Sequence, residues 1–353
     1  MSGVKKITQR IEYIDAMRGF TMILVVLHHV SLMAFGRNSV TDEWLVEFRM
    51  PLFFFVSGFV LYKSAGQWNM KEYFAFLRRK VDVQILSPLI FFCIYVYIYN
   101  RGLLGSLIDP NKSGYWFTFM LFAYYVMYIA IQMLLDKLLQ NEFKKDGLLI
   151  LTGCSVFIGA YGLQYLYLEK DMVIMGFIGG AHYKYFLFFI GGVLVRKYFC
   201  SFEKVLDSSY FLPFCISLYF LLNIFSVPIN IGGGFYRIFF ILSTAITGIV
   251  VVFSFFRRYQ GQFSKDKLLG KTLQKIGRRT LDIYLLHYFF IPYQLSDVFP
   301  LFLKYNLPVV EMACSLVVTS LVIACCLLIS ATLRISPELA SFLFGAKKDK
   351  RCE

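Results

Sequence analysis

Long apolar runs dominate this sequence, and each is close to the roughly 20 residues that an α-helix needs to cross a lipid bilayer. Hydrophobic residues make up 58% of the chain and charged residues only 16%, against about 25% in soluble domains. We therefore predict an all-α fold, a polytopic membrane helix bundle with about ten transmembrane helices. The predicted spans cover residues 15–36, 45–63, 82–99, 115–135, 148–167, 182–199, 209–226, 235–256, 279–299 and 306–333.

The distribution of Lys and Arg predicts the orientation of this bundle. Basic residues concentrate in the loops that face the cytoplasm when the N-terminus lies inside, as the positive-inside rule requires. The net charge of +14 suits the anionic headgroups of membrane lipids. No nucleic-acid partner is expected, because the chain has no soluble basic domain. We expect one transmembrane domain over residues 1–353, with cytoplasmic termini and no appended soluble domain.

Arg18 and His29 are the most informative polar residues, because both fall inside the first predicted span with ten residues between them. Eleven helical steps amount to three turns plus about 20°, so the two side chains share one face, about 16 Å apart along the axis. His28 points roughly 80° away from that line. Ionisable groups in hydrocarbon usually face a polar interior and mark function.

Each of these residues also has a structural interpretation. Arg18 can pair with Asp15 one turn earlier, or extend its guanidinium to the headgroup level. His29 lies too deep for that and is either a general base or an interhelical hydrogen-bond partner.

Three further sets of residues are candidates for binding substrates. Ser57 and Gly58 in the second span favour close helix packing, although the Ser57 hydroxyl can also contact a ligand. Arg78, Arg79 and Lys80 precede the third span, where they suit phosphate groups or simply follow the positive-inside rule. His287 is a second histidine in a predicted span and strengthens the case for a polar interior. The eight cysteines show no metal-binding or disulfide spacing, so we expect no metal.

Taken together, these segments resemble the acyltransferase 3 family of integral membrane acyltransferases over nearly the whole chain. Asp15 to Phe20 running to His29 resembles the family's first-span signature, an arginine, ten residues and a histidine, and Met50 to Phe59 resembles its MPLFF–SGF motif. Supporting likenesses cover Tyr73–Pro88, Trp116–Tyr124, Phe186–Arg196 and Gly277–His287.

The resemblance implies transfer of an acyl group, usually acetyl, from cytoplasmic acyl-coenzyme A to a sugar hydroxyl of an envelope or lipid-linked glycan, in the bacterial cytoplasmic membrane. It makes His29 the catalytic base and Arg18 part of the donor channel. It assigns Arg78 and Arg79, with Lys80 and Ser57, to the coenzyme. Residues expected near the substrates are Asp15, Trp116, Tyr284 and His287. Many relatives carry histidine where this chain has Arg49, which leaves more of the proton transfer to His29.

Two other classes explain part of the pattern. A polytopic carrier or flippase for a glycan or lipid accounts for the spans and the basic loops, but not for the shared face of Arg18 and His29 or for the second-span motif. An inert scaffold of an envelope-synthesis complex would tolerate replacement of both His29 and His287. The sequence does not identify the acceptor sugar, the acyl group or the oligomeric state.

Overall fold

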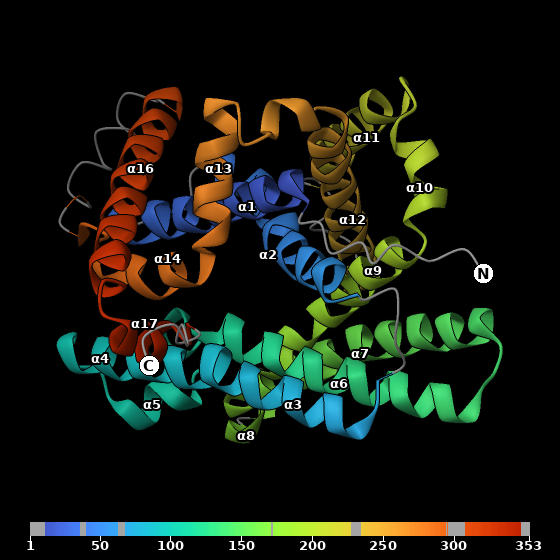
Figure 1. Cartoon of the computed structure of the whole chain (residues 1–353), viewed down its shortest axis with the longest axis horizontal. Helices are drawn as coiled ribbons and strands as arrows, with labels where there is room; N and C mark the ends of the chain where they lie inside the picture. The colour runs from blue at the N-terminus through green and yellow to red at the C-terminus, as the bar shows by residue number, and fades with distance from the viewer. Residues whose placement is uncertain are drawn as a thin grey trace, which may run out of the picture. The chain divides into compact units, whose positions relative to one another are not determined.

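The computed structural model describes residues 11–35, 40–62, 68–170, 172–226, 234–293, 295 and 308–346. Within these ranges the regular structure is helical and no strand is present, which confirms the predicted all-α class. Figure 1 shows the helices with the labels used below. The chain divides into two compact units, and each unit is assembled from three stretches of the sequence. The single-domain organisation expected from the sequence remains a prediction.

Unit 1 consists of residues 1–66, 195–280 and 291–323. Its helices are α1 (Glu12–Ala34), α2 (Val40–Leu61), α10 (Phe199–Leu206), α11 (Phe211–Ser226), α12 (Gly234–Arg258) and α13 (Leu268–Arg278), with a 3-10 turn, η5 (Gln260–Phe263), between the last two.

Unit 2 consists of residues 67–194, 281–290 and 324–353. Its elements are α3 (Met70–Val81), the π-helical turn η1 (Asp82–Leu86), α4 (Ser87–Ile98), α5 (Leu103–Ile108), η2 (Lys112–Gly114), α6 (Trp116–Leu138), α7 (Glu142–Lys170), α8 (Val173–Phe177), η3 (Gly180–Tyr185), η6 (His287–Phe289) and α17 (Pro337–Phe344). Three helices carry the chain from one unit to the other, namely α9 (Phe186–Lys197), α14 (Thr280–Leu286) and α16 (Pro308–Leu333).

Seven helical segments of the described chain are long and apolar enough to cross a membrane, one of them formed by α3, η1 and α4 together (Met70–Ile98), or eight if the bent pair of α9 and α10 counts as one span. The predicted number of about ten is therefore approximate. The chain bends by 91° between α9 and α10, at the end of the sixth predicted span. The seventh corresponds to α11, whose apolar stretch has fewer than 18 residues. The ninth, 279–299, is not one long helix: α14 ends at Leu286, a 3-10 turn follows, and Pro292 cannot continue a helix. Its residues 296–299 lie outside the described ranges.

The core of unit 1 forms around α1, which packs against α2, α12 and α13. Gly19 of α1 and Gly277 of α13 meet backbone to backbone. A Cβ atom on Gly277 would collide with the carbonyl oxygen of Asp15, and one on Gly19 would collide with that of Leu273. Because only glycine permits this approach, the two residues fix where α13 crosses α1.

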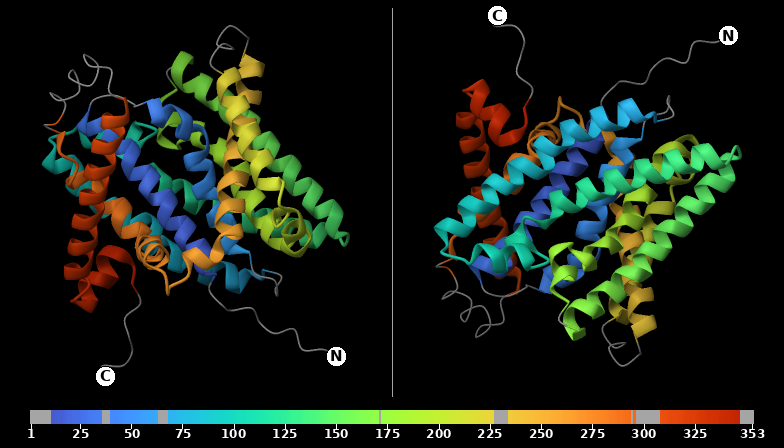
Figure 2. Two further views of the ribbon diagram at one scale, coloured as in Figure 1. Left: turned by 90° about the horizontal axis from the view of Figure 1, so that it is seen from above. Right: turned by 90° about the horizontal axis from the view of Figure 1, so that it is seen from below.

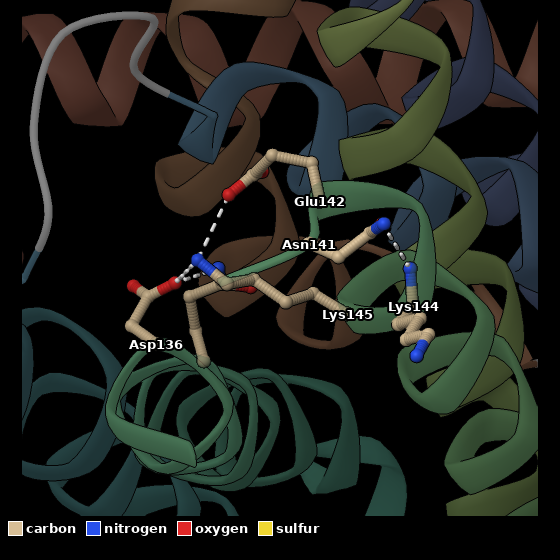
Figure 3. A network of polar contacts seen from close by, with 6 residues as sticks. Asp136, Asn141, Glu142, Lys144 and Lys145 are labelled. Carbon is tan, nitrogen blue, oxygen red and sulfur yellow. Dashed lines mark hydrogen bonds and ion pairs between the residues drawn. The ribbon is translucent and has the colours of Figure 1, made fainter. Parts of the chain in front are cut away.

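A helical hairpin, α6 and α7, forms a large part of unit 2 (Figure 2). Its connection is held by Lys145, whose Nζ lies 2.8 Å from a carboxylate oxygen of Asp136 and 2.8 Å from one of Glu142 (Figure 3). Asn141, within the connection, accepts a hydrogen bond from the backbone N–H of Lys144 at 3.2 Å. The buried cation and its two carboxylates set the end of the hairpin.

A buried ion pair joins α14 to α16 within unit 2. Arg334 Nε and Nη2 each donate to a carboxylate oxygen of Asp282 at 2.8 Å, and the Ser330 hydroxyl donates to the same carboxylate. Asp282 is 2% exposed. The Arg334 guanidinium also lies 4.7 Å from the ring centre of Phe344 in α17. This bidentate pair anchors the start of α14, where the sequence had placed no partner for Asp282.

Candidate functional site

Arg18 and His29 lie on one uninterrupted helix, α1, so the helical phase expected from their spacing applies. Most of α1 is buried, from Tyr13 through Ala34. Both Arg18 and His29 are exceptions, since each keeps part of its side chain accessible, 31% in the case of Arg18. Arg18 and His29 are therefore accessible to a ligand, as are the other accessible residues of α1, namely Glu12, Phe20, Ile23, His28, Leu32 and Met33.

Two contacts orient the Arg18 guanidinium. Nη1 lies 3.8 Å from a carboxylate oxygen of Asp15, which confirms the pairing expected one turn apart. Nη2 donates a hydrogen bond to Thr280 Oγ1 at 3.2 Å, across 262 residues of sequence. The Gly19–Gly277 contact brings the end of α13, and with it Thr280, to this part of α1. Sequence reasoning missed Thr280 as a partner of Arg18, because only the close helix crossing creates the contact.

His29 lies beyond the middle of α1, with the ring of His28 as a neighbour at 5.4 Å between ring centres. Both rings are partly exposed. An accessible imidazole is a suitable general base, since its ordinary pKa lies near neutrality.

Ser57 of α2 belongs to the motif that prompted the resemblance, and Arg49 directly precedes it. The Ser57 hydroxyl donates to the backbone carbonyl of Phe53 at 2.9 Å, a local bond one helical turn back. This bond favours a structural role for Ser57, and its contact with the coenzyme stays a prediction. Arg49 is buried, at 5% exposure.

Tyr284 and His287 lie together in unit 2, in the interior of the protein. The Tyr284 hydroxyl donates to the carbonyl of Gly114 at 2.8 Å and accepts the N–H of Phe117 at 3.2 Å. His287 is 0% exposed, and its Nδ1 lies 3.0 Å from the Ile283 carbonyl. Hydrogen bonds to the backbone on a fully buried side chain favour a structural role over substrate binding.

The loop before α6 presents Trp116 and is built around a buried lysine. Lys112 Nζ donates to the carbonyl oxygens of Leu107 at 3.1 Å and Phe177 at 2.8 Å. Burial lowers the pKa of Lys112, and the nearby Asp109 carboxylate opposes that shift.

Gly114, in the same loop, has a φ of 99° and lies against the Tyr288 ring, so no other residue fits there.

Trp116 itself stacks on a ring from a distant part of unit 2. Its ring centre lies 3.8 Å from that of His182, with an angle of 11° between the planes, and 5.7 Å from that of Tyr185. The structure therefore brings Trp116 into the same region as Tyr284, through their shared contacts with Phe117. No contact in the structure tests the predicted role of Trp116 with substrate.

The three basic residues before the third predicted span lie on α3. Arg78 and Arg79 are exposed, and within the described part of the chain neither forms an ion pair. Arg79 Nε donates to the Ala75 carbonyl at 3.1 Å. Lys80 is partly covered, with Nζ 4.8 Å from the ring centre of Tyr125. Arg78 and Arg79 are thus accessible to an anionic ligand, and their role with a phosphate remains a prediction.

The described helices define a multi-pass membrane protein whose first helix exposes a histidine and an arginine on one face. Comparison with protein families identifies the class: the acyltransferase domain of the acyltransferase 3 family matches residues 11–331. The chain belongs to this family and is an acyltransferase, and the match favours the enzyme over the carrier and the scaffold. Neither the curated proteins nor the solved structures gave a significant match.

Proposed function

We propose that this protein transfers an acyl group, usually acetyl, from cytoplasmic acyl-coenzyme A to a hydroxyl of an envelope or lipid-linked glycan. The setting is the bacterial cytoplasmic membrane. The observation that carries the proposal is the accessibility of both Arg18 and His29 on α1, a helix that buries most of its residues. Family membership supplies the reaction class, and the glycan acceptor follows from the resemblance of the motifs.

His29 acts as the general base in this scheme. A sugar hydroxyl is a poor nucleophile, so it needs a base within hydrogen-bond reach to take its proton as it attacks. The hydroxyl oxygen forms a bond to the thioester carbonyl carbon, the carbon–sulfur bond breaks, and the proton held by His29 passes to the leaving thiolate. His29 is then neutral again and ready for another turnover.

Arg18 binds the donor at the end of α1 that the Lys and Arg pattern predicts to be cytoplasmic. Its guanidinium is fixed by Asp15 and Thr280 and still retains accessible surface. A cation held in place on the same face as the base suits the polar part of an acyl-coenzyme A whose thioester reaches further into the membrane. Arg78, Arg79 and Lys80 are further candidates for the phosphates of the coenzyme.

Mass spectrometry of envelope glycans tests the proposal. Cells that lack the protein are complemented with wild type, with His29→Ala, or with His28→Ala as a matched control on the same helix. We expect an O-acyl mass increment with wild type and with His28→Ala, and none with His29→Ala. Equal increments in all three strains would show that His29 is not required for acyl transfer. Absence of any increment with wild type would argue against a glycan acceptor.

A further inference from the structure

Four helix ends of unit 1 meet in a cluster of aromatic and basic side chains. We call it the Arg196 cluster, and it comprises Tyr13 from α1, Phe59 from α2, Arg196 from α9 and Phe199 from α10. The rings of Phe59 and Phe199 lie 5.9 Å apart. The guanidinium carbon of Arg196 is 5.1 Å from the centre of Phe59 and 5.9 Å from that of Phe199.

A second arginine at the same place provides a contrast. Arg257 of α12 also lies over Phe199, at 5.4 Å, but it forms ion pairs with Glu203 and Asp207 of the α10 segment. Arg196 forms no ion pair with any residue that the structure describes. A guanidinium that rests on aromatic rings keeps its N–H groups for an acceptor, and a planar oxyanion fits them best.

Tyr13 adds an unused donor to this cation. The residue is 4% exposed, and within the described part of the chain its hydroxyl hydrogen has no acceptor, although Arg257 lies close enough to act on the oxygen as a donor. The ring of Tyr13 lies 6.4 Å from that of Phe253 in α12, which in turn packs against Phe59 at 5.5 Å and Phe199 at 6.4 Å, so Tyr13 lies within the cluster. A buried hydroxyl whose hydrogen has no acceptor costs free energy. A bound anion that accepts its hydrogen would remove that cost and balance Arg196 at the same time.

We infer that Arg196 and Tyr13 bind a phosphate group at the end of unit 1 that the Lys and Arg pattern predicts to be cytoplasmic. This anion site is formed by residues other than Arg78, Arg79 and Lys80. Coenzyme A carries a 3′-phosphate and a diphosphate, so it offers more than one phosphate position. The headgroup of an anionic lipid offers the same chemistry. The coenzyme as the source rests on the proposed function, whereas the lipid as the source does not.

Binding measurements on the purified full-length protein test the site. Affinity for coenzyme A and for dephospho-coenzyme A is measured in zwitterionic nanodiscs for wild type, Arg196→Gln and Tyr13→Phe. We expect Arg196→Gln to bind coenzyme A about tenfold more weakly, the effect of one charge-assisted hydrogen bond, and Tyr13→Phe several-fold more weakly. Arg196→Lys should fall between wild type and Arg196→Gln, because it keeps the charge and loses the planar fork.

Arg258→Gln is the matched control. Arg258 follows Arg257 on α12, is exposed, and donates to the carbonyls of Ser208 and Ser209 at 3.3 Å and 3.2 Å. We expect its affinity for coenzyme A to stay within about twofold of wild type, as is usual for an exposed charge.

A second arm separates the two sources of phosphate. Thermal unfolding is compared in nanodiscs of phosphatidylglycerol and of phosphatidylcholine. One outcome is that wild type binds no coenzyme A, is stabilised by phosphatidylglycerol, and loses that stabilisation when Arg196 is replaced by Gln. The site would then hold a lipid phosphate, and coenzyme A as the proposed donor would be wrong. If Arg196→Gln behaves like Arg258→Gln in both arms, the phosphate site is wrong.

Discussion

Unit 1 and unit 2 each place a histidine in a segment that the sequence predicts to span the membrane, and they treat it differently. His29 in unit 1 is partly exposed, on a helix that packs against α2, α12 and α13. His287 in unit 2 is fully buried, and its Nδ1 lies beside a backbone carbonyl. The same residue type thus fits a catalytic role in one unit and a structural role in the other.

The polar residues around the two histidines differ in the same way. In unit 1, Arg18 is held by Asp15 and Thr280 but keeps 31% of its side chain accessible. In unit 2, the polar atoms of Asp282 and Tyr284 form hydrogen bonds with other residues of the protein, and both side chains are nearly inaccessible. Accessibility, rather than the mere presence of an ionisable group in an apolar segment, separates candidates for chemistry from candidates for stability.

The largest effect is expected from the buried ion pair of unit 2. Asp282→Ala leaves Arg334 without its bidentate partner, and breaking such a pair costs about 3–5 kcal/mol of folding free energy. Thermal unfolding in detergent measures the loss. Adding Arg334→Met should recover part of it, because the uncompensated charge is removed. A single variant as stable as wild type would contradict the anchoring role of this pair.

The helix crossing of unit 1 should be nearly as sensitive. Gly277→Ala forces α13 away from α1, and we expect a loss of about 2–3 kcal/mol, typical of overpacking, together with reduced activity because Thr280 moves from Arg18. Gly147→Ala is the control, since a Cβ there meets nothing within 4 Å. It should change stability by no more than about 1 kcal/mol. Equal effects of the two substitutions would show that the crossing is not close-packed.

Tyr284→Phe tests the structural role of the buried polar residues in unit 2. It leaves the Gly114 carbonyl and the Phe117 N–H without this hydroxyl, which we expect to cost about 1–3 kcal/mol of stability. The specific activity of the folded protein should remain near that of wild type. Tyr97→Phe, at a position 86% exposed, is the control and should be neutral. A large fall in kcat for a stable Tyr284→Phe protein would return this residue to the substrate site.

The smallest effect is expected at Thr280. Thr280→Val keeps the shape of the side chain and removes one hydrogen bond to Arg18, worth about 1 kcal/mol. We expect kcat/KM for acetyl-coenzyme A to fall about fivefold, mainly through KM. Thr332→Val, which removes only a bond to the Leu328 carbonyl one turn back in α16, should leave both constants unchanged. Indistinguishable kinetics for the two variants would mean that Thr280 does not position Arg18.

Local relations were predictable from the sequence, and distant ones were not. The Asp15–Arg18 pair and the common face of Arg18 and His29 follow from helical periodicity alone. Contact of Thr280 with Arg18 depends on where α13 crosses α1, and no periodic pattern records a crossing between segments 262 positions apart.

The buried ion pair left a weak signal in the sequence. Asp282 lies near the inner end of the ninth predicted span and Arg334 directly follows the inner end of the tenth, and opposite charges at the edge of hydrocarbon usually pair. The exposure of His29 and the burial of His287 could not be read from the sequence, because both lie in apolar segments and burial depends on neighbouring helices.

The most direct test of this account compares the two histidines in one assay. The initial rate of acyl transfer from acetyl-coenzyme A and the thermal unfolding midpoint are measured for purified His29→Gln and His287→Gln. We predict a rate at least about 100-fold below wild type for His29→Gln with an unchanged midpoint, as expected on loss of a general base. His287→Gln should show a lower midpoint with a near-normal rate per folded molecule. A fully active His29→Gln protein, or a stable and inactive His287→Gln protein, would contradict the account.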